Sequence, residues 1–232
     1  GATFTYTAVD TETYALTIRG AGAGTTIIDG NSARPCMFID LTVFRGSLNP
    51  GGSSFQPPDQ APIDDSDATV TVENLTFQNG QDTTCSPSFE NDCLPQSGGL
   101  EIDTYSAPII VDDCVFDSNS GNECGGFLAF SFTGDISLSD STATNNQSLW
   151  NNQNGSGVRL QTGRGNPNDC TDDPHKSFHG EDQGSLSVTN STFSGNTTED
   201  GRGNGVGLAA SASRGDVTVT DCTFADNDVN GD

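Results

Sequence analysis

The sequence predicts an all-β fold in which short parallel strands wind into a β-helix, a solenoid with irregular loop insertions. Three observations predict this class: one phrase recurs along the chain, aliphatic residues alternate within each copy, and turn-forming residues dominate the composition. The 232 residues include 28 Gly and one Met, with Asn, Asp, Ser and Thr abundant, which is typical of short strands joined by many turns. The length suits a single domain, residues 1–232.

The recurring phrase is eight residues long and occurs five times without gaps. Each copy has aliphatic residues seven and five positions before its last residue, the anchor, as expected of a strand with one buried face. The anchor is Phe in four copies and Ala in the third. The copies are "VTVENLTF" (70–77), "IIVDDCVF" (109–116), "ISLSDSTA" (136–143), "LSVTNSTF" (186–193) and "VTVTDCTF" (217–224).

An Asn or Asp stands three residues before every anchor, where it interrupts the strand. Asn and Asp tolerate a left-handed backbone and bond their own turn, so we expect a corner of the solenoid there. These residues are Asn74, Asp113, Asp140, Asn190 and Asp221. A second Asn stands three residues after four of the anchors, at Asn119, Asn146, Asn196 and Asn227.

Like phrases stack most simply in parallel, each coil resting on the one before, about 4.8 Å apart. The anchors then form an internal aromatic column of Phe77, Phe116, Phe193 and Phe224, with Ala143 as a gap, and the corner residues form a ladder. Glycine-rich segments at 98–103, 125–130, 155–161 and 203–210 predict a further strand in each coil. We expect opening coils over 1–67 with a long loop at 45–67, five repeats over 68–232, and an insertion at 163–183.

Charge restricts the partners that the chain can bind. The formal net charge is −24, from 32 acidic and 8 basic residues, and such a surface repels nucleic acid and anionic lipid. No apolar run is long enough to span a membrane, so we expect no direct membrane insertion. The acidic residues form either a solvated surface or specific cation sites, for which calcium is the candidate ion.

Seven cysteines without zinc-binding spacing favour an oxidising, extracellular location. Cys85 and Cys93 bracket a loop short enough for a local disulfide, and we expect Cys170 to bond Cys124 and pin the long insertion to the stack. Cys114 and Cys222 share one column about 14 Å apart, too far for a disulfide, and are expected to be small core residues.

Three segments carry a family resemblance. "LTIRGAGAGTTIIDGN" (16–31), "VTNSTFSGN" (188–196) and "VTDCTFADN" (219–227) resemble bacterial right-handed parallel β-helix repeat proteins of the pectin-lyase-like superfamily. The resemblance implies a right-handed coil. For function it implies one of two classes: pectate lyases and other polysaccharide-active enzymes, or adhesin-like surface proteins, among them proteins of the choice-of-anchor type.

The enzyme alternative has few candidate residues. Arg159 is the one basic residue in a predicted strand and is a weak candidate for the base of a lyase; the alternative is a strand arginine paired with neighbouring acids. A metal could bind the acidic and imidazole groups of 169–182, although a polar surface loop is the competing interpretation. That metal set consists of Asp172, Asp173, His175, His179, Glu181 and Asp182.

Five asparagines stand in glycosylation sequons. Asn74 and Asn190 belong to the corner ladder and are expected to be structural. Asn146, Asn154 and Asn196 are the glycosylation candidates.

The two ends of the coil look uncapped. The N-terminal segment alternates Phe4 and Tyr6 with smaller residues as a free strand would, and the last phrase is followed only by a short polar segment. We expect either that the natural chain continues or that molecules stack head to tail. The sequence therefore predicts an extracellular structural or adhesive surface protein, a filament subunit that self-associates or binds cell-surface glycans. The alternative is a calcium-assisted polysaccharide lyase or glycoside hydrolase.

Overall fold

A computed structural model describes residues 2–7, 14–41, 68–82, 97–104, 106–131, 133–149, 155–163, 184–199 and 205–229. Within these ranges every regular element is a β-strand, and every strand pairing is parallel. The all-β parallel β-helix predicted from the repeats is confirmed. The predicted loop at 45–67 lies outside the described residues, as does most of the insertion at 163–183.

The strands form four sheets, of which three run from the first described coil to the last and the fourth begins at the third coil, and each strand pairs with its equivalent in the next coil. The first sheet contains β1 (Phe4–Thr7), β4 (Met37–Asp40), β7 (Leu100–Thr104), β11 (Phe127–Ser131), β15 (Val158–Thr162) and β19 (Leu208–Ala212). The second sheet contains β2 (Leu16–Arg19), β5 (Val70–Glu73), β8 (Ile109–Asp112), β12 (Ile136–Ser139), β16 (Leu186–Thr189) and β20 (Val217–Thr220).

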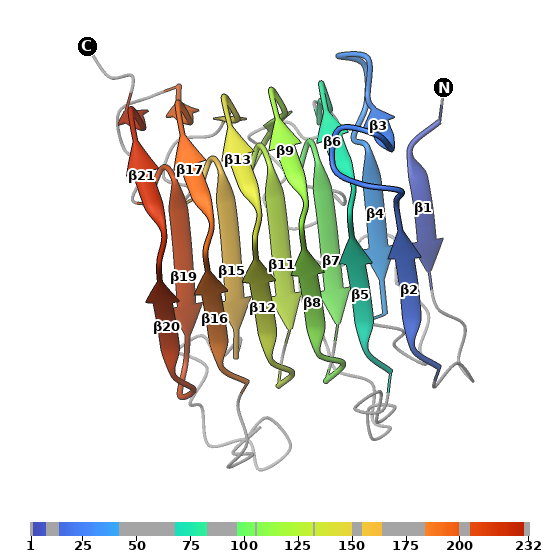
Figure 1. Ribbon diagram of the computed structural model, residues 1–232, viewed down its shortest axis with the longest axis vertical. Helices are drawn as coiled ribbons and strands as arrows, with labels where there is room; N and C mark the ends of the chain where they lie inside the picture. The colour runs from blue at the N-terminus through green and yellow to red at the C-terminus, as the bar shows by residue number, and fades with distance from the viewer. Residues whose placement is uncertain are drawn as a thin grey trace, which may run out of the picture.

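The third and fourth sheets are built from shorter strands. The third contains β3 (Ile27–Asp29), β6 (Thr76–Gln78), β9 (Val115–Asp117), β13 (Thr142–Thr144), β17 (Thr192–Ser194) and β21 (Thr223–Ala225). The fourth contains the two-residue strands β10 (Ser120–Gly121), β14 (Gln147–Ser148), β18 (Thr197–Thr198) and β22 (Asp228–Val229). In Figure 1 the chain runs up the front layer and down the back layer while it advances from right to left, which is the sense of a right-handed coil.

The corner between the second and third sheets is made by the predicted Asn and Asp ladder. All five residues have a left-handed backbone, with φ of 60° at Asn74, 47° at Asp113, 48° at Asp140, 48° at Asn190 and 55° at Asp221. A single left-handed residue turns the chain without disturbing the strand alternation on either side. The side chain of Asn190 also donates a hydrogen bond to Asp140 in the coil before it.

The core is the narrow interior between the sheets, and the anchor residues stack along it. The Phe77 and Phe116 rings are 5.5 Å apart between centroids and nearly parallel, and those of Phe193 and Phe224 are 5.0 Å apart. Ala143 lies in register between Phe116 and Phe193. The first four of these five anchor residues are buried, whereas Phe224, in the last described coil, is 51% exposed.

The gap at Ala143 is filled from another sheet. Phe127 of β11 belongs to the same coil as Ala143, and its ring stacks on Phe116 at 5.3 Å with an interplanar angle of 8°. The row of Phe127 has Leu100 before it and Val158 after it, which are both smaller. The coil with Ala143 in place of an anchor Phe therefore has an aromatic ring, that of Phe127, on the first sheet instead.

Candidate functional site

An internal ladder of asparagines lines the turn after the third sheet. The side-chain amide of Asn146 donates to the carbonyl of Phe116 at 2.9 Å and to Asn196 Oδ1 at 3.0 Å. Its Oδ1 accepts from the backbone N–H of Asn119 at 3.0 Å and from the Asn119 side chain at 3.1 Å. Asn196 makes the equivalent bonds to the carbonyl of Ala143 and to the next residue of the ladder.

The prediction that Asn146 and Asn196 carry glycans is wrong. Both residues are fully buried, and the amide nitrogen that a glycan would occupy donates two hydrogen bonds inside the coil. A Cβ at Gly126 would lie 3.0 Å from Asn146 Nδ2 and 2.3 Å from the carbonyl of Gly157, so the ladder also requires glycine beside it. The third candidate, Asn154, lies outside the described residues.

The cysteines of the described coils are free thiols. Cys124, predicted to bond Cys170, is fully buried, and its Sγ donates to the carbonyl of Phe127 at 3.2 Å. Burial raises its pKa to about 12. The predicted bridge is wrong, because the turn that holds Cys124 packs it inward as a small core residue. Cys85, Cys93 and Cys170 lie outside the described residues.

Cys114 and Cys222 are both free and separate, as their positions in one column predict. Cys114 is buried in the core, and burial raises its pKa to about 12. Cys222, in the last described coil, is only half-buried. The oxidising location stays a prediction, because the other three cysteines lie outside the described residues.

Arg159 lies on β15, on the face of the first sheet that points away from the core. Its Nη1 forms an ion pair with Glu123 Oε2 at 2.5 Å, and its Nη2 donates to Gln161 Oε1 at 3.4 Å. The guanidinium group has donors and no acceptor. The geometry therefore gives Arg159 the role of a paired strand arginine.

The proposed metal set, Asp172, Asp173, His175, His179, Glu181 and Asp182, lies outside the described residues. Among the coils that the structure describes, no three His, Cys, Asp or Glu side chains are grouped closely enough to hold a metal ion. No helix in those parts of the chain is long and apolar enough to cross a membrane.

The most distinctive surface is the C-terminal end of the coil, which we call the C-terminal end surface: Leu208, Val217, Val219, Cys222 and Phe224. Its residues occupy core positions but are open to solvent. Val217 is 45% exposed, whereas Leu186 and Ile136, the equivalent residues of the two preceding coils, are buried. Phe193 is 1% exposed against 51% for Phe224, although the two rings stack.

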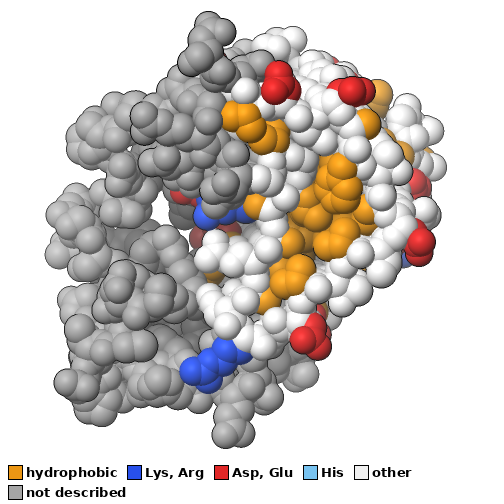
Figure 2. Space-filling model, turned by 90° about the vertical axis from the view of Figure 1, so that its left-hand side faces the viewer, with side chains coloured by type: hydrophobic (Ala, Val, Ile, Leu, Met, Phe, Trp, Pro, Cys, Tyr) orange, Lys and Arg blue, Asp and Glu red, His pale blue; other side chains and the backbone are white. Residues whose placement is uncertain are grey.

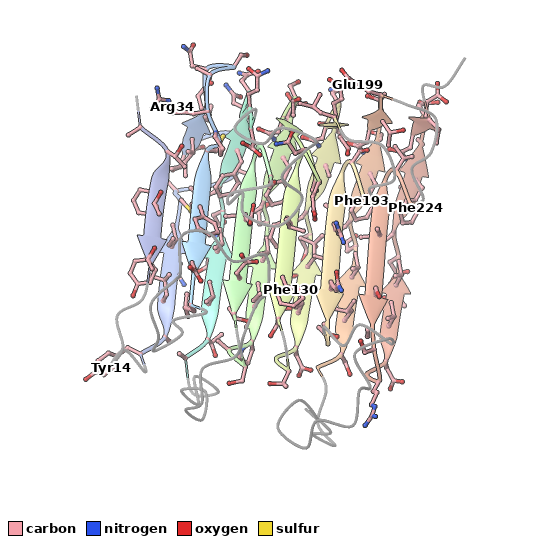
Figure 3. All side chains as sticks on the ribbon, turned by 180° about the vertical axis from the view of Figure 1, so that it is seen from behind. Tyr14, Arg34, Phe130, Phe193, Glu199 and Phe224 are labelled. Atoms are coloured by element: carbon pink, nitrogen blue, oxygen red, sulfur yellow. The ribbon has the colours of Figure 1, made fainter. Side chains whose placement is uncertain are left out.

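Figure 2 shows this end of the molecule with hydrophobic side chains gathered at its centre and acidic ones around the rim. A shallow hollow of about 390 Å³ lies beside Phe224, bordered by residues 205–208 and 225–227. In Figure 3, Phe193 and Phe224 lie together at this end of the coil. At this surface the side chains of the hydrophobic core are thus exposed to solvent.

The N-terminal end is also open. Phe4 is 52% exposed, and β1, β2 and β3 have no neighbouring strand on their outer side within the described ranges. The N-terminal segment is nevertheless not a free strand, because β1 pairs with β4 along its whole length, from Phe4 opposite Met37 to Thr7 opposite Asp40. Tyr6, the other predicted assembly residue, packs against the core from β1.

Sheet order and packing together define this chain as a parallel β-helix. Comparisons with protein families, curated proteins and solved structures found no match to it. The assignment of the fold therefore depends on the strand order, register and packing described above.

Proposed function

We propose that this chain is a structural protein of a cell surface, which works by association through the ends of its coil and has no catalytic residues of its own. One observation carries the proposal: core positions that are buried in interior coils are open to solvent in the C-terminal end surface. Exposed strand edges and exposed apolar residues both favour association, and here they coincide.

The finer assignment belongs to the same proposal. Membership of the pectin-lyase-like superfamily is supported by the right-handed parallel coil and by the resemblance of residues 16–31 to bacterial surface β-helix proteins. An extracellular location is supported by that resemblance alone. The net charge of −24 favours a partner other than nucleic acid or anionic lipid.

Association can be measured by light scattering of the purified chain over a range of protein and salt concentrations. We expect the average particle mass to rise with concentration. Phe224→Asp should weaken this association about tenfold or more, because an unpaired carboxylate would have to be buried in the contact.

Ile110→Asp is the matched control. Ile110 is also a large exposed hydrophobic residue, 38% exposed, but it points outward from an interior coil, so its replacement should leave association unchanged. A native chain that stays monomeric at every concentration, salt and calcium level would overturn the proposal.

A second candidate function is a calcium-assisted polysaccharide lyase or glycoside hydrolase. One observation favours it: the outer face of the first sheet aligns Asp40 with Asp103, and the same row continues through Phe130 to Gln161. Carboxylates on neighbouring strands can serve sugar chemistry or bind calcium. Unsaturated products from acidic glycans would establish a lyase, and new reducing ends without unsaturation would establish a hydrolase; either activity, lost in Asp103→Asn, would favour this alternative over the structural one.

A further inference from the structure

The outward-facing residues of the second and third sheets change character along the coil. In both sheets alternate residues point away from the core, so each coil contributes two such positions from each sheet. In the coils of β12, β16 and β20, all of these positions except Ala225 are Ser or Thr. We call them the hydroxyl array: Ser137, Ser139, Thr142, Thr144, Ser187, Thr189, Thr192, Ser194, Thr218, Thr220 and Thr223.

The same rows carry charged and amide groups in the preceding coils. In the second sheet the residues in register before Ser139 are Arg19, Glu73 and Asp112. In the third sheet those before Thr144 are Asp29, Gln78 and Asp117. Uncharged strand faces are thus confined to one part of a chain whose net charge is −24.

The array lies on an open face of the molecule. Figure 1 shows the second and third sheets together as the front layer of the coil, with β12 running into β13, β16 into β17 and β20 into β21. Among the residues that the structure describes, Ser139 and Thr144 donate to Asp112 and Asp117 of the preceding coil. The side chains of the other array residues in that part of the chain form no hydrogen bond, so their hydroxyls are available to a ligand.

The spacing of the array is close to that of ordered water. Equivalent hydroxyls on neighbouring strands are about 4.8 Å apart. In a tetrahedral network with O–H···O distances of about 2.7–2.8 Å, two water molecules bonded to the same third one are about 4.5 Å apart. If a row of such water molecules is centred on β16, the hydroxyls of β12 and β20 are each displaced from it by about 0.3 Å. That displacement is smaller than the range of about 0.5 Å over which O–H···O bonds form, so all three strands can bond the same row.

Hydroxyl groups also have the bonding capacity that such a network requires. A Ser or Thr hydroxyl donates one hydrogen bond and accepts two, whereas a carboxylate only accepts and a guanidinium only donates. A hydroxyl can therefore occupy the place of a water molecule at the surface of the network. The corner residues Asp140, Asn190 and Asp221 run between the second and third sheets and divide the array into two halves.

We propose that the hydroxyl array binds ice, with the rows of Ser and Thr hydroxyls taking the positions of water molecules in the surface layer of the crystal. A single hydroxyl contributes little, because it exchanges one hydrogen bond to water for another. The parallel strands hold many hydroxyls in fixed positions before contact, so their contributions add without a cost of ordering them. This inference goes beyond the proposed function and concerns a different surface from the C-terminal end surface.

Retention of the protein by slowly growing ice tests the proposal. A solution of the full chain is partly frozen, and the protein concentrations in the ice and in the remaining liquid are compared. We expect enrichment of the native chain in the ice, from which ordinary solutes are excluded. Thr189→Tyr should lower the ratio of the two concentrations about tenfold or more, because the ring on β16 would hold the crystal away from the hydroxyls of β12 and β20.

Thr71→Tyr is the matched control. Thr71 is an outward-facing, half-buried residue of β5 in the same sheet, but it lies outside the array, beside Glu73. Its replacement should leave retention by ice at the native value. Ser187→Tyr, in the other row of β16, is a second variant with the same expected loss as Thr189→Tyr. Circular dichroism establishes that each variant is folded before its retention is compared.

Exclusion of the native chain from ice would overturn the proposal. Native retention by a folded Thr189→Tyr or Ser187→Tyr variant would also overturn it, as would an equal loss in Thr71→Tyr. If the native chain were excluded from ice but bound insoluble cellulose, the array would be a site for neutral polysaccharide instead. A chain that stays monomeric at every concentration would overturn the proposed function and leave the binding of ice unaffected, because the two surfaces are distinct.

Discussion

Asn146→Ala should be among the most destabilising single substitutions in this chain. The side chain makes four hydrogen bonds: two accepted from Asn119 and one each donated to the Phe116 carbonyl and to Asn196 Oδ1. All of them lie in the interior of the coil, where Asn146 is fully buried. Alanine removes the four bonds together.

The magnitude follows from the count of bonds. At about 1 kcal/mol for each net hydrogen bond, their loss lowers the free energy of unfolding by about 4 kcal/mol. The buried backbone N–H of Asn119 loses its acceptor, which places the effect at the upper end of that range. A domain of this kind is held by about 5–15 kcal/mol, so the variant should retain only part of its stability.

Urea denaturation followed by circular dichroism measures this loss. Gln147→Ala is the control, because the neighbouring Gln147 makes one exposed, long hydrogen bond of 3.4 Å to Glu199, and its removal should change stability by about 0.5 kcal/mol or less. If Asn146→Ala and Gln147→Ala unfolded at the same urea concentration, the asparagine ladder would contribute nothing, and the account of the buried amides would be refuted.

Three further predictions concern the core and Arg159. Ala143→Phe should destabilise the fold by about 1–3 kcal/mol through overpacking, and Phe127→Leu should also destabilise it. The double variant should unfold at a higher urea concentration than the sum of the two single losses implies. Simple additivity of the two losses would disprove the idea that Phe127 compensates for Ala143. Burial raises the pKa of the Cys124 thiol to about 12, so folding favours the protonated thiol. The free energy of unfolding that this contributes is fully present below pH 9.0 and is lost as the pH rises from there towards 12. Cys124→Ala should therefore flatten the decline in the free energy of unfolding at alkaline pH, and an unchanged decline would contradict the assignment. Arg159→Ala should lower stability by about 1 kcal/mol or less, since its ion pair is partly solvated, and a loss of several kcal/mol in denaturation would show that the pair is structurally essential.

The coils were predictable because each repeats the same local chemistry. Strand alternation and a left-handed Asn or Asp three residues before the anchor are short-range signals, and the structure gives the corner residues φ near 50° in every copy. Parallel stacking then follows from repetition, because equivalent residues have only one register in which all of them coincide. The two-residue strands of the fourth sheet carry no such pattern and were not predicted.

The roles of the asparagines were harder to predict, because the same Asn can satisfy both the sequon pattern and the ladder pattern. Asn146 and Asn196 match the glycosylation pattern, yet their position three residues after the anchor repeats at Asn119 and Asn227, which are not sequons. That repetition was a signal for a structural role. Sites of surface modification need not recur at the same position in every coil, whereas the residues of an interior ladder must.

The pairing of Ala143 with Phe127 could not be predicted from either row of equivalent residues alone. The anchor column alone shows a missing ring, and the glycine-rich segment alone shows an unusually large residue, but neither predicts that the two coincide. In this coil the large Phe127 of the first sheet offsets the small Ala143 of the third, so close packing is kept although both positions differ from their neighbours. In the last described coil the column ends with Phe224, which stacks on Phe193 on one side and is 51% exposed.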